Sequence, residues 1–90
     1  MNIVMILGEV TTTPMDYGGV VGFTIKNVRD WKDRYGKQYF KEIFIPINAF
    51  DSVGEAVANN LEIGEKAIFI GRLERNKRGM IVILEKFHKV

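Results

Sequence analysis

The chain has 90 residues, a formal net charge of +2 and 47% hydrophobic residues, and it contains no cysteine. This length fits one domain, residues 1–90, and leaves no room for a second hydrophobic core. The lack of cysteine excludes a disulfide framework, a thiol nucleophile and a thiolate metal site, and it suits a reducing cytoplasm. The apolar run Met1–Leu7 has no basic leader and is far shorter than the roughly 20 residues that span a membrane. We therefore expect a cytoplasmic protein with no membrane partner.

Strand-forming residues open the chain. Asn2–Leu7 is predicted to be a strand, because apolar and β-branched residues dominate it. Gly8 indicates a kink or bulge. Thr11–Thr13 are expected to continue the strand until Pro14, which cannot donate a ladder hydrogen bond.

A hairpin is predicted next. Gly18-Gly19 indicates a turn, and Val20–Val28 follows as the second strand. The segment Arg29–Gln38 is polar and charged, with Gly36 near its end, and we interpret it as a long hairpin loop.

The third strand, Tyr39–Phe50, alternates with a period of two. One face is aliphatic and is expected to face the core: Ile43, Ile45, Ile47 and Ala49. The opposite face mixes aromatic and polar residues: Phe40, Glu42, Phe44, Pro46, Asn48 and Phe50. A solvent face does not need these aromatic residues, so they suggest a further role. Pro46 indicates an edge position or a bulge.

A short amphipathic helix is expected after this strand. Ser52–Glu55 matches a capping box, in which the Ser hydroxyl and the Glu carboxylate accept hydrogen bonds from free N–H groups at a helix start. Apolar residues then recur at helical spacing for about two turns: Val53, Ala56, Val57 and Leu61. Asn59-Asn60 and Gly64 end the helix.

Two strands complete the chain, Lys66–Leu73 and Met80–Phe87, joined by a turn at Arg75–Gly79. A five-stranded barrel with a helix between its third and fourth strands is the arrangement of the OB-fold. The predicted fold class is therefore all-β, a five-stranded OB-fold barrel with a short helix between strands 3 and 4. A five-stranded SH3-like barrel is the rival, but it does not predict the helix.

Catalytic chemistry finds little support in the sequence. His88 is the only histidine and lies near the C-terminal end, where a lone histidine is usually a solvated side chain. The carboxylates are scattered, the glycines form neither a Walker A motif nor a dinucleotide-binding fingerprint, and no metal-ligand spacing occurs. Distant residues can still converge in three dimensions. We expect no enzyme activity, no catalytic residue, no metal and no cofactor.

Positive charge gathers in two segments although the net charge is small. Lys26–Lys41 holds six basic residues against two acidic ones, and Arg72–Arg78 holds four against one. Between them, Glu42–Gly71 is acidic. Such segregation can give the protein one positive face, which a polyanion requires. Two solvated hairpin tips are the alternative interpretation.

Aromatic residues accompany the basic ones. A base stacked on an aromatic ring gives about 1–3 kcal/mol, and Lys and Arg neutralise phosphates. The aromatic candidates for such binding are Trp31, Tyr35, Tyr39, Phe44 and Phe50. The basic candidates are Arg29, Lys32, Arg34, Lys37, Arg72, Arg75, Lys77 and Arg78. Structural alternatives stay open: Trp31 folds back onto the barrel, or Phe44 and Phe50 cover a barrel end or a subunit contact.

Several motifs occur in order along the chain. The first two predicted strands contain Asn2-x-Val4-x-x-x-Gly8, Pro14, and Phe23-Thr24-Ile25 followed by Trp31. The later motifs are Phe44-x-Pro-x-Asn-Ala-Phe50, Leu61-x-x-Gly64 and Ile68-x-x-Gly71-Arg72-Leu73. This series resembles the bacterial and phage single-stranded-DNA-binding protein family over nearly the whole chain.

The resemblance implies one OB-fold nucleic-acid-binding domain in which Trp31, Phe44 and Phe50 stack on DNA bases. Phe44 stands where the family often has tryptophan. A further family tryptophan, on the last hairpin, falls near Arg78, which would contact phosphate or stack through its guanidinium plane. The implied protein is nucleoid-associated and acts in DNA replication, recombination or repair.

The resemblance also bears on partners. Family members form dimers and tetramers that commonly pair first strands, which makes Asn2–Leu7 a candidate homo-oligomer interface, although this strand can equally be core. Cellular members carry an acidic C-terminal tail that recruits replication and repair proteins, whereas this sequence ends at Val90, directly after the predicted fifth strand. The likeness to primosomal replication protein N gives an alternative function, a primosome-type protein-interaction module with secondary DNA binding. A cold-shock-type RNA-binding module is a third possibility, although the sequence lacks a clustered Phe/His motif.

Overall fold

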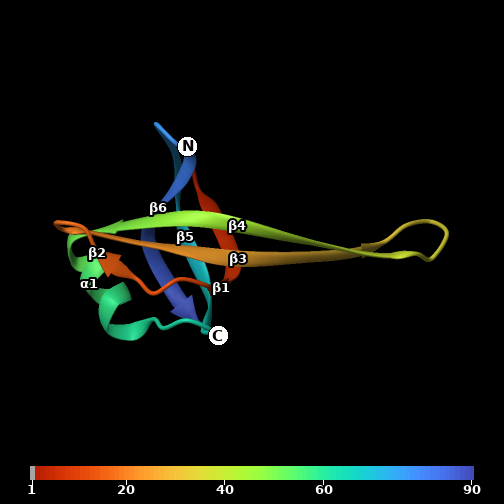
Figure 1. The fold of residues 1–90 in the computed structure, drawn as a ribbon, viewed down its shortest axis with the longest axis horizontal. Coiled ribbons are helices and arrows are strands. Elements are labelled where there is room, and N and C mark those ends of the chain that lie inside the picture. The colour runs from red at the N-terminus through yellow and green to blue at the C-terminus, as the bar shows by residue number, and fades with distance from the viewer. Residues whose placement is uncertain (1) are drawn as a thin grey trace.

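The computed structural model describes residues 2–90, so Met1 of the apolar opening run lies outside the described residues. The elements in chain order are β1 (Val4–Val10), β2 (Met15–Asp16), β3 (Val20–Lys32), β4 (Gln38–Phe50), α1 (Asp51–Asn60), β5 (Lys66–Asn76) and β6 (Gly79–Lys89) (Figure 1). No helix within residues 2–90 is long and apolar enough to cross a membrane.

Five strands close into a barrel. Hydrogen-bonded neighbours follow the order β1-β5-β6-β4-β3, and β1 also pairs with β3. Neighbouring strands are antiparallel except β4 and β6, which run parallel at Ile47↔Val82 and Asn48↔Ile83. The helix follows the third barrel strand, β4, and precedes the fourth, β5. The predicted OB-fold is therefore confirmed.

The segment after β1 differs from the prediction. Thr11–Thr13 do not continue the strand, and a short extra strand, β2, follows Pro14 and pairs with β3. Thr11 still donates its N–H to Thr24 O at 2.9 Å, but the return bond of a strand pair is not made, because Thr24 N–H donates to the hydroxyl oxygen of Thr12 at 2.8 Å. The predicted Gly18-Gly19 turn is confirmed and joins β2 to β3.

β1 closes the barrel by changing its partner. Val4–Glu9 pair with β5, and Glu9 and Val10 pair with β3. A Cβ atom on Gly8 would lie 2.7 Å from Ile25 Cδ1. The β1–β5 register continues through Gly8, so the bulge predicted there is absent. Glycine instead allows the close approach of the two strands.

Alternate strand residues fill the barrel, and Val57 of α1 and the C-cap residue Leu61 add to the core. The rings of Phe23 and Phe69 lie 5.8 Å apart at its centre. Other members of the core cluster are Val10, Val21, Ile25, Ile47, Ala49, Ala67, Val82 and Leu84. The predicted core face of the third strand is thus confirmed at its C-terminal half. It is wrong at Ile43, which is 40% exposed.

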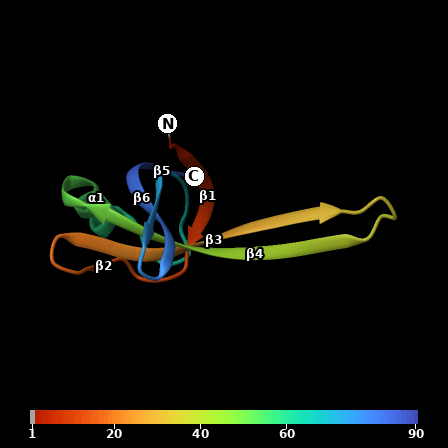
Figure 2. The ribbon, with the colours of Figure 1, turned by 90° about the horizontal axis from the view of Figure 1, so that it is seen from above.

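Ile43 is exposed because β3 and β4 continue beyond the barrel as a two-stranded arm (Figure 2). Their antiparallel pairing runs without interruption from Val20↔Phe50 to Lys32↔Gln38. The molecule measures 50 × 26 × 22 Å, and the arm accounts for its length. The long loop predicted over Arg29–Gln38 is therefore wrong. Half of this segment is strand, Arg29–Lys32 and Gln38, and the connection is confined to residues 33–37.

The start of the helix also differs from the prediction. α1 begins at Asp51, directly after β4, and Phe50 is the N-cap residue with no side-chain cap hydrogen bond. The capping box predicted at Ser52–Glu55 is therefore wrong, since these residues lie inside the helix. Asp51 has a φ of 52°, which turns the chain sharply from strand to helix. The helix ends at Asn60, as predicted.

β5 and β6 form a tight hairpin. The turn predicted at Arg75–Gly79 is confirmed but shorter, because β5 extends to Asn76 and β6 begins at Gly79. The register shifts between Ile70 and Gly71. A Cβ atom on Gly71 would overlap the carbonyl oxygen of Ile83, so the β-bulge requires glycine here.

Replacing Gly71 by alanine should lower the free energy of unfolding by about 3 kcal/mol, the upper range for overpacking a well-packed interior. The expected clash is with backbone, which cannot move without breaking the β5–β6 ladder. Gly22→Ala is the matched control, because its Cβ would meet only side-chain atoms of Asn48 and Tyr17, at 3.3 Å or more. Urea unfolding of both variants tests this, and equal midpoints would contradict it.

Candidate nucleic-acid interface

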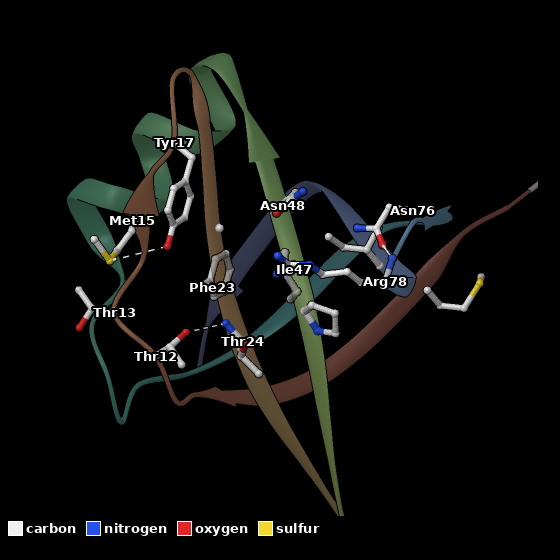
Figure 3. A pocket seen from close by; sticks show the side chains of 14 residues that line it. Thr12, Thr13, Met15, Tyr17, Phe23, Thr24, Ile47, Asn48, Asn76 and Arg78 are labelled. Carbon is white, nitrogen blue, oxygen red and sulfur yellow. Dashed lines mark hydrogen bonds between the residues drawn. The ribbon is translucent and has the colours of Figure 1, made fainter.

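An open groove of about 810 Å³ lies between the segment around β2, the outer face of β3 and β4, and the β5–β6 hairpin (Figure 3). The first wall consists of Thr12, Thr13, Met15 and Tyr17. The floor includes Gly22, Phe23, Thr24, Pro46, Ile47 and Asn48. The second wall consists of Asn76, Arg78, Met80 and Ile81. In OB-folds, this strand face and the loops beside it bind oligonucleotides or oligosaccharides.

Local hydrogen bonds build the first wall. Thr24 N–H donates to Thr12 Oγ1 at 2.8 Å, which attaches the loop before β2 to β3 (Figure 3). Tyr17 then lies over β3 at Gly22, where an added Cβ would be 3.4 Å from Tyr17 Cε2. Because Gly22 has no side chain, the Tyr17 ring can pack directly over the β3 backbone. The ring remains 68% exposed, so it is available to a ligand.

The outer face of β4 carries the groove floor between two phenylalanines. Alternation places Phe44, Pro46, Asn48 and Phe50 on one side of the strand. Phe44 is 56% exposed and Phe50 is 43% exposed. Neither side chain is used to fill the barrel, in contrast to Ile47 and Ala49 beside them. The two predicted stacking residues thus flank the groove along one strand face.

The arm carries a second aromatic group on its other face. Trp31 and Tyr39 are directly opposite each other across the strands, and their rings are stacked at 5.4 Å with 14° between planes. The Arg29 guanidinium lies 5.1 Å from the Trp31 ring centre, and Lys37 Nζ lies 5.4 Å from that of Tyr39. By alternation, this pair does not share a ribbon face with Phe44. Trp31 and Tyr39 therefore form one aromatic group, and Phe44 and Phe50 form another.

The tip of the arm is organised by Asp33. Its Oδ1 accepts hydrogen bonds from the N–H groups of Tyr35 (2.8 Å) and Lys37 (3.0 Å), and its Oδ2 accepts one from the Tyr39 hydroxyl (3.1 Å). The hydrogen bond from the Lys37 N–H is the main cause that holds the pKa of Asp33 below its ordinary value. Desolvation raises this pKa, and the bonds from Tyr35 and Tyr39 lower it further. Asp33 is therefore a carboxylate at neutral pH.

The remaining predicted residues are spread over the arm and the last hairpin. Tyr35 is 80% exposed at the arm tip, with the Arg34 guanidinium 5.1 Å from its ring centre. Lys32 lies at the end of β3, on the same ribbon face as Phe44. On the last hairpin, Arg78 lines the groove. Arg72 is engaged with Glu74, with Arg72 Nε 2.6 Å from the carboxylate. Arg75 and Lys77 are exposed but do not line the groove.

Sequence reasoning missed the groove-lining residues of the first wall. Thr12 and Thr13 were expected in a strand, and Tyr17 was assigned no role. An exposed tyrosine directly before a Gly-Gly turn is a signal that could have found this wall, although its position over Gly22 depends on the folded chain. Within residues 2–90, no group of three or more His, Asp or Glu residues could hold a metal ion.

Comparison with known proteins gives matches among solved structures. No protein-family model and no curated protein sequence matches the chain. A small single-stranded DNA-binding protein from Streptomyces coelicolor has a TM-score of 0.81 and 17% identity over 98% of this chain and 91% of its own. A Plasmodium falciparum SSB, solved in complex with ssDNA, has a TM-score of 0.81 and 19% identity over 100% and 95%. The protein PriB from Ralstonia solanacearum has a TM-score of 0.68 and 10% identity over 99% and 97%. At these identities the likeness establishes the fold, and this chain has the OB-fold seen in single-stranded-DNA-binding proteins and PriB.

Proposed function

We propose that the chain binds single-stranded DNA with little sequence preference, by stacking bases on exposed aromatic rings and by drawing phosphates to Lys and Arg. The observation that carries this proposal is the outer face of β4. Phe44 and Phe50 are exposed there on either side of Pro46 and Asn48, which form part of the groove floor. A DNA strand laid along β4 would meet a ring, a groove and a second ring in succession. The likeness to a protein solved with ssDNA adds support.

Single-stranded DNA suits these surfaces better than duplex DNA. Stacking needs unpaired bases, whose faces are free. Reading a duplex needs a helix or ribbon that enters the major groove. The helix α1 carries Glu55 and no basic residue, so it is a poor partner for phosphates.

The two aromatic groups imply a path for the DNA strand. It begins in the groove, where Arg78 supplies positive charge, and passes along β4 to Phe44. Two-stranded ribbons twist strongly, so a strand that continues along the arm reaches the Trp31–Tyr39 face by winding round it. Basic residues lie along both faces and the tip of the arm: Arg29, Lys32, Arg34 and Lys37.

Such binding would protect unpaired DNA in replication, recombination or repair, in a nucleoid-associated protein without enzyme activity of its own. A primosome-type interaction module is the second candidate, and it is supported by the match to PriB over 97% of that chain. In such a module DNA contact is secondary. Replacing Trp31 by alanine would then hardly change the affinity for DNA, whereas the proposed function requires a clear loss.

Addition of a dT oligonucleotide should quench the intrinsic fluorescence of the protein. Trp31 is the only tryptophan and is 39% exposed, so the signal reports directly on the arm. The affinity should fall as salt rises, with a log–log slope of about −0.7 for each phosphate neutralised. Titration over a series of salt concentrations measures both quantities. Absence of quenching and of salt-dependent binding at low ionic strength would overturn the proposal. A parallel titration with an RNA oligonucleotide distinguishes an RNA-binding module.

Replacing Phe44 or Phe50 by alanine should each weaken binding of the dT oligonucleotide by about 1–3 kcal/mol, the range for loss of one base stack. The fold should persist, because both rings are exposed and the core cluster does not include them. Ile63→Ala is the control, since Ile63 is 58% exposed in the loop after α1, away from the groove lining. If the two phenylalanine variants bound as tightly as this control, the rings would not be stacking surfaces.

We also propose that the chain forms a homo-oligomer through β1. Ile3, Met5 and Leu7 alternate on one face and are 63%, 67% and 55% exposed. Between Val4 and Gly8, β1 pairs with β5 on one edge, and its pairing with β3 begins at Glu9. Among residues 2–90, no strand pairs with the other edge of β1 along Val4–Ile6, and at Leu7 the side chain of Asn27 donates to the carbonyl oxygen at 2.7 Å. A second copy could pair along Val4–Ile6, since an exposed apolar strand edge favours such association.

Met5→Lys should convert this oligomer to monomers, because it places a charge in the middle of the apolar β1 face. Light scattering of the wild type and the variant measures the change in mass. Ile63→Lys adds the same charge at a similarly exposed apolar residue outside β1 and should leave the mass unchanged. A monomeric wild type, or a Met5→Lys variant that stays oligomeric, would refute the β1 interface.

A further inference from the structure

The arm that is proposed to contact DNA contains a carboxylate at its tip. Lys26–Lys41 holds six basic residues, whose charge suits phosphates, together with Asp30 and Asp33. A carboxylate near a phosphate raises the free energy of the complex by repulsion. Asp30 lies on the same ribbon face as Phe44, whereas Asp33 begins the tip. The contacts of Asp33 indicate what it contributes there.

Both carboxylate oxygens of Asp33 are engaged within the arm. One oxygen accepts the two backbone N–H groups of Tyr35 and Lys37, and the other accepts the Tyr39 hydroxyl. The backbone adds two more bonds at the same residue: Asp33 N–H donates to Lys37 O at 3.0 Å, and Gly36 N–H donates to Asp33 O at 3.1 Å. The turn is therefore arranged around this one side chain, and only the turn residues and Tyr39 take part.

The Tyr39 hydroxyl connects this turn to the aromatic pair. Tyr39 is held at its ring by Trp31, stacked at 5.4 Å, and at its hydroxyl by Asp33. The β4 backbone holds one end of the Tyr39 side chain and the Asp33 carboxylate holds the other, so the ring has a defined orientation against which the indole of Trp31 stacks. Trp31 still has 39% of its surface exposed. A base can therefore add to a pair of rings that is already in place.

We propose that Asp33 is a positioning residue, which holds Tyr39 and thereby Trp31 as a preassembled stacking unit for a base of single-stranded DNA. This inference rests on the proposed function. Asp33 makes no contact with DNA, and its negative charge opposes binding. Its contribution is to order the two rings before DNA arrives, which removes part of the entropy loss that ordering side chains on binding requires.

The two possible roles of Asp33 predict opposite changes in DNA affinity when it is replaced by alanine. If Asp33 acted only as a charge, Asp33→Ala would strengthen DNA binding, because a repulsive group is lost. If it positions the rings, Asp33→Ala weakens binding by about threefold to tenfold, the effect of freeing one or two side chains. Asp30→Ala is the matched control, since it removes the same charge from the same arm. It should leave the affinity unchanged or raise it.

A second variant isolates the hydrogen bond without changing any charge. Tyr39→Phe keeps the ring and removes the hydroxyl that donates to Asp33, and it should weaken binding of a dT oligonucleotide by about twofold to threefold. Tyr35→Phe is its control, because Tyr35 is 80% exposed at the tip and takes part in the turn through its backbone N–H. Tyr35→Phe serves only the DNA-free measurements, and Ile63→Ala, at a 58% exposed residue in the loop after α1, is the variant that should bind DNA like the wild type.

The measurements are the affinity for a dT oligonucleotide and, without DNA, the near-ultraviolet circular dichroism and acrylamide quenching of Trp31. Asp33→Ala and Tyr39→Phe should lose the signal of the stacked rings and make Trp31 more accessible, while Asp30→Ala and Tyr35→Phe should not. Tighter DNA binding by Asp33→Ala, or unchanged Trp31 signals in its DNA-free form, would overturn the positioning role. A wild type that fails to bind DNA would instead overturn the proposed function, and the DNA-free signals distinguish the two failures.

Discussion

The antiparallel register between β3 and β4 determines where four of the proposed stacking residues lie: Trp31, Tyr39, Phe44 and Phe50. This pairing runs from Val20↔Phe50 to Lys32↔Gln38 without a shift. Burial of one face in the barrel, including Phe23 and Ile47, fixes the register, because a slip of one residue would turn these side chains to solvent. The same constraint turns Phe44 and Phe50 outward, beside the groove. The stability of the core and the exposure of the aromatic face are therefore two consequences of one strand pairing.

Beyond the barrel, β3 and β4 stay paired in the same register, but no hydrophobic core packs against them. An isolated two-stranded ribbon is at best marginally stable in water. Contacts between side chains across the arm must therefore provide the stability that core packing provides in the barrel. The stacked Trp31–Tyr39 pair does so through a direct cross-strand contact, which is the unit of stabilisation in a sheet. Asp33 closes the ribbon at its tip through hydrogen bonds to the turn. The residues that keep the arm ordered are thus also the residues proposed to present it to DNA.

Local patterns predicted most of the fold, and the errors share a physical cause. The order of strands and helix follows from period-two and helical spacing, and the outward position of Phe44 and Phe50 follows from alternation alone. The predicted loop over Arg29–Gln38 was wrong because its residues are polar, and the cross-strand pairs that make it a ribbon are not local. The helix start was misplaced because Asp51 turns the chain by its backbone conformation. Tyr17 was missed because its ring rests over Gly22 of another strand. The roles of the site residues remain predictions.

The two aromatic groups differ in how much order they have before a ligand binds. Phe44 and Phe50 project from the part of β4 that the barrel holds, because Ala49 belongs to the core cluster and Ile45 packs against it. Trp31 and Tyr39 stand on a ribbon outside the barrel, where only contacts within the arm restrict them. The last hairpin contributes Arg78 rather than a ring to the groove, so base stacking depends on these two groups. A flexible arm would lose conformational entropy for each ring that became ordered on binding DNA. The Asp33 carboxylate reduces this loss by holding the rings in place, which explains why an acidic residue is tolerated among the basic residues of the arm.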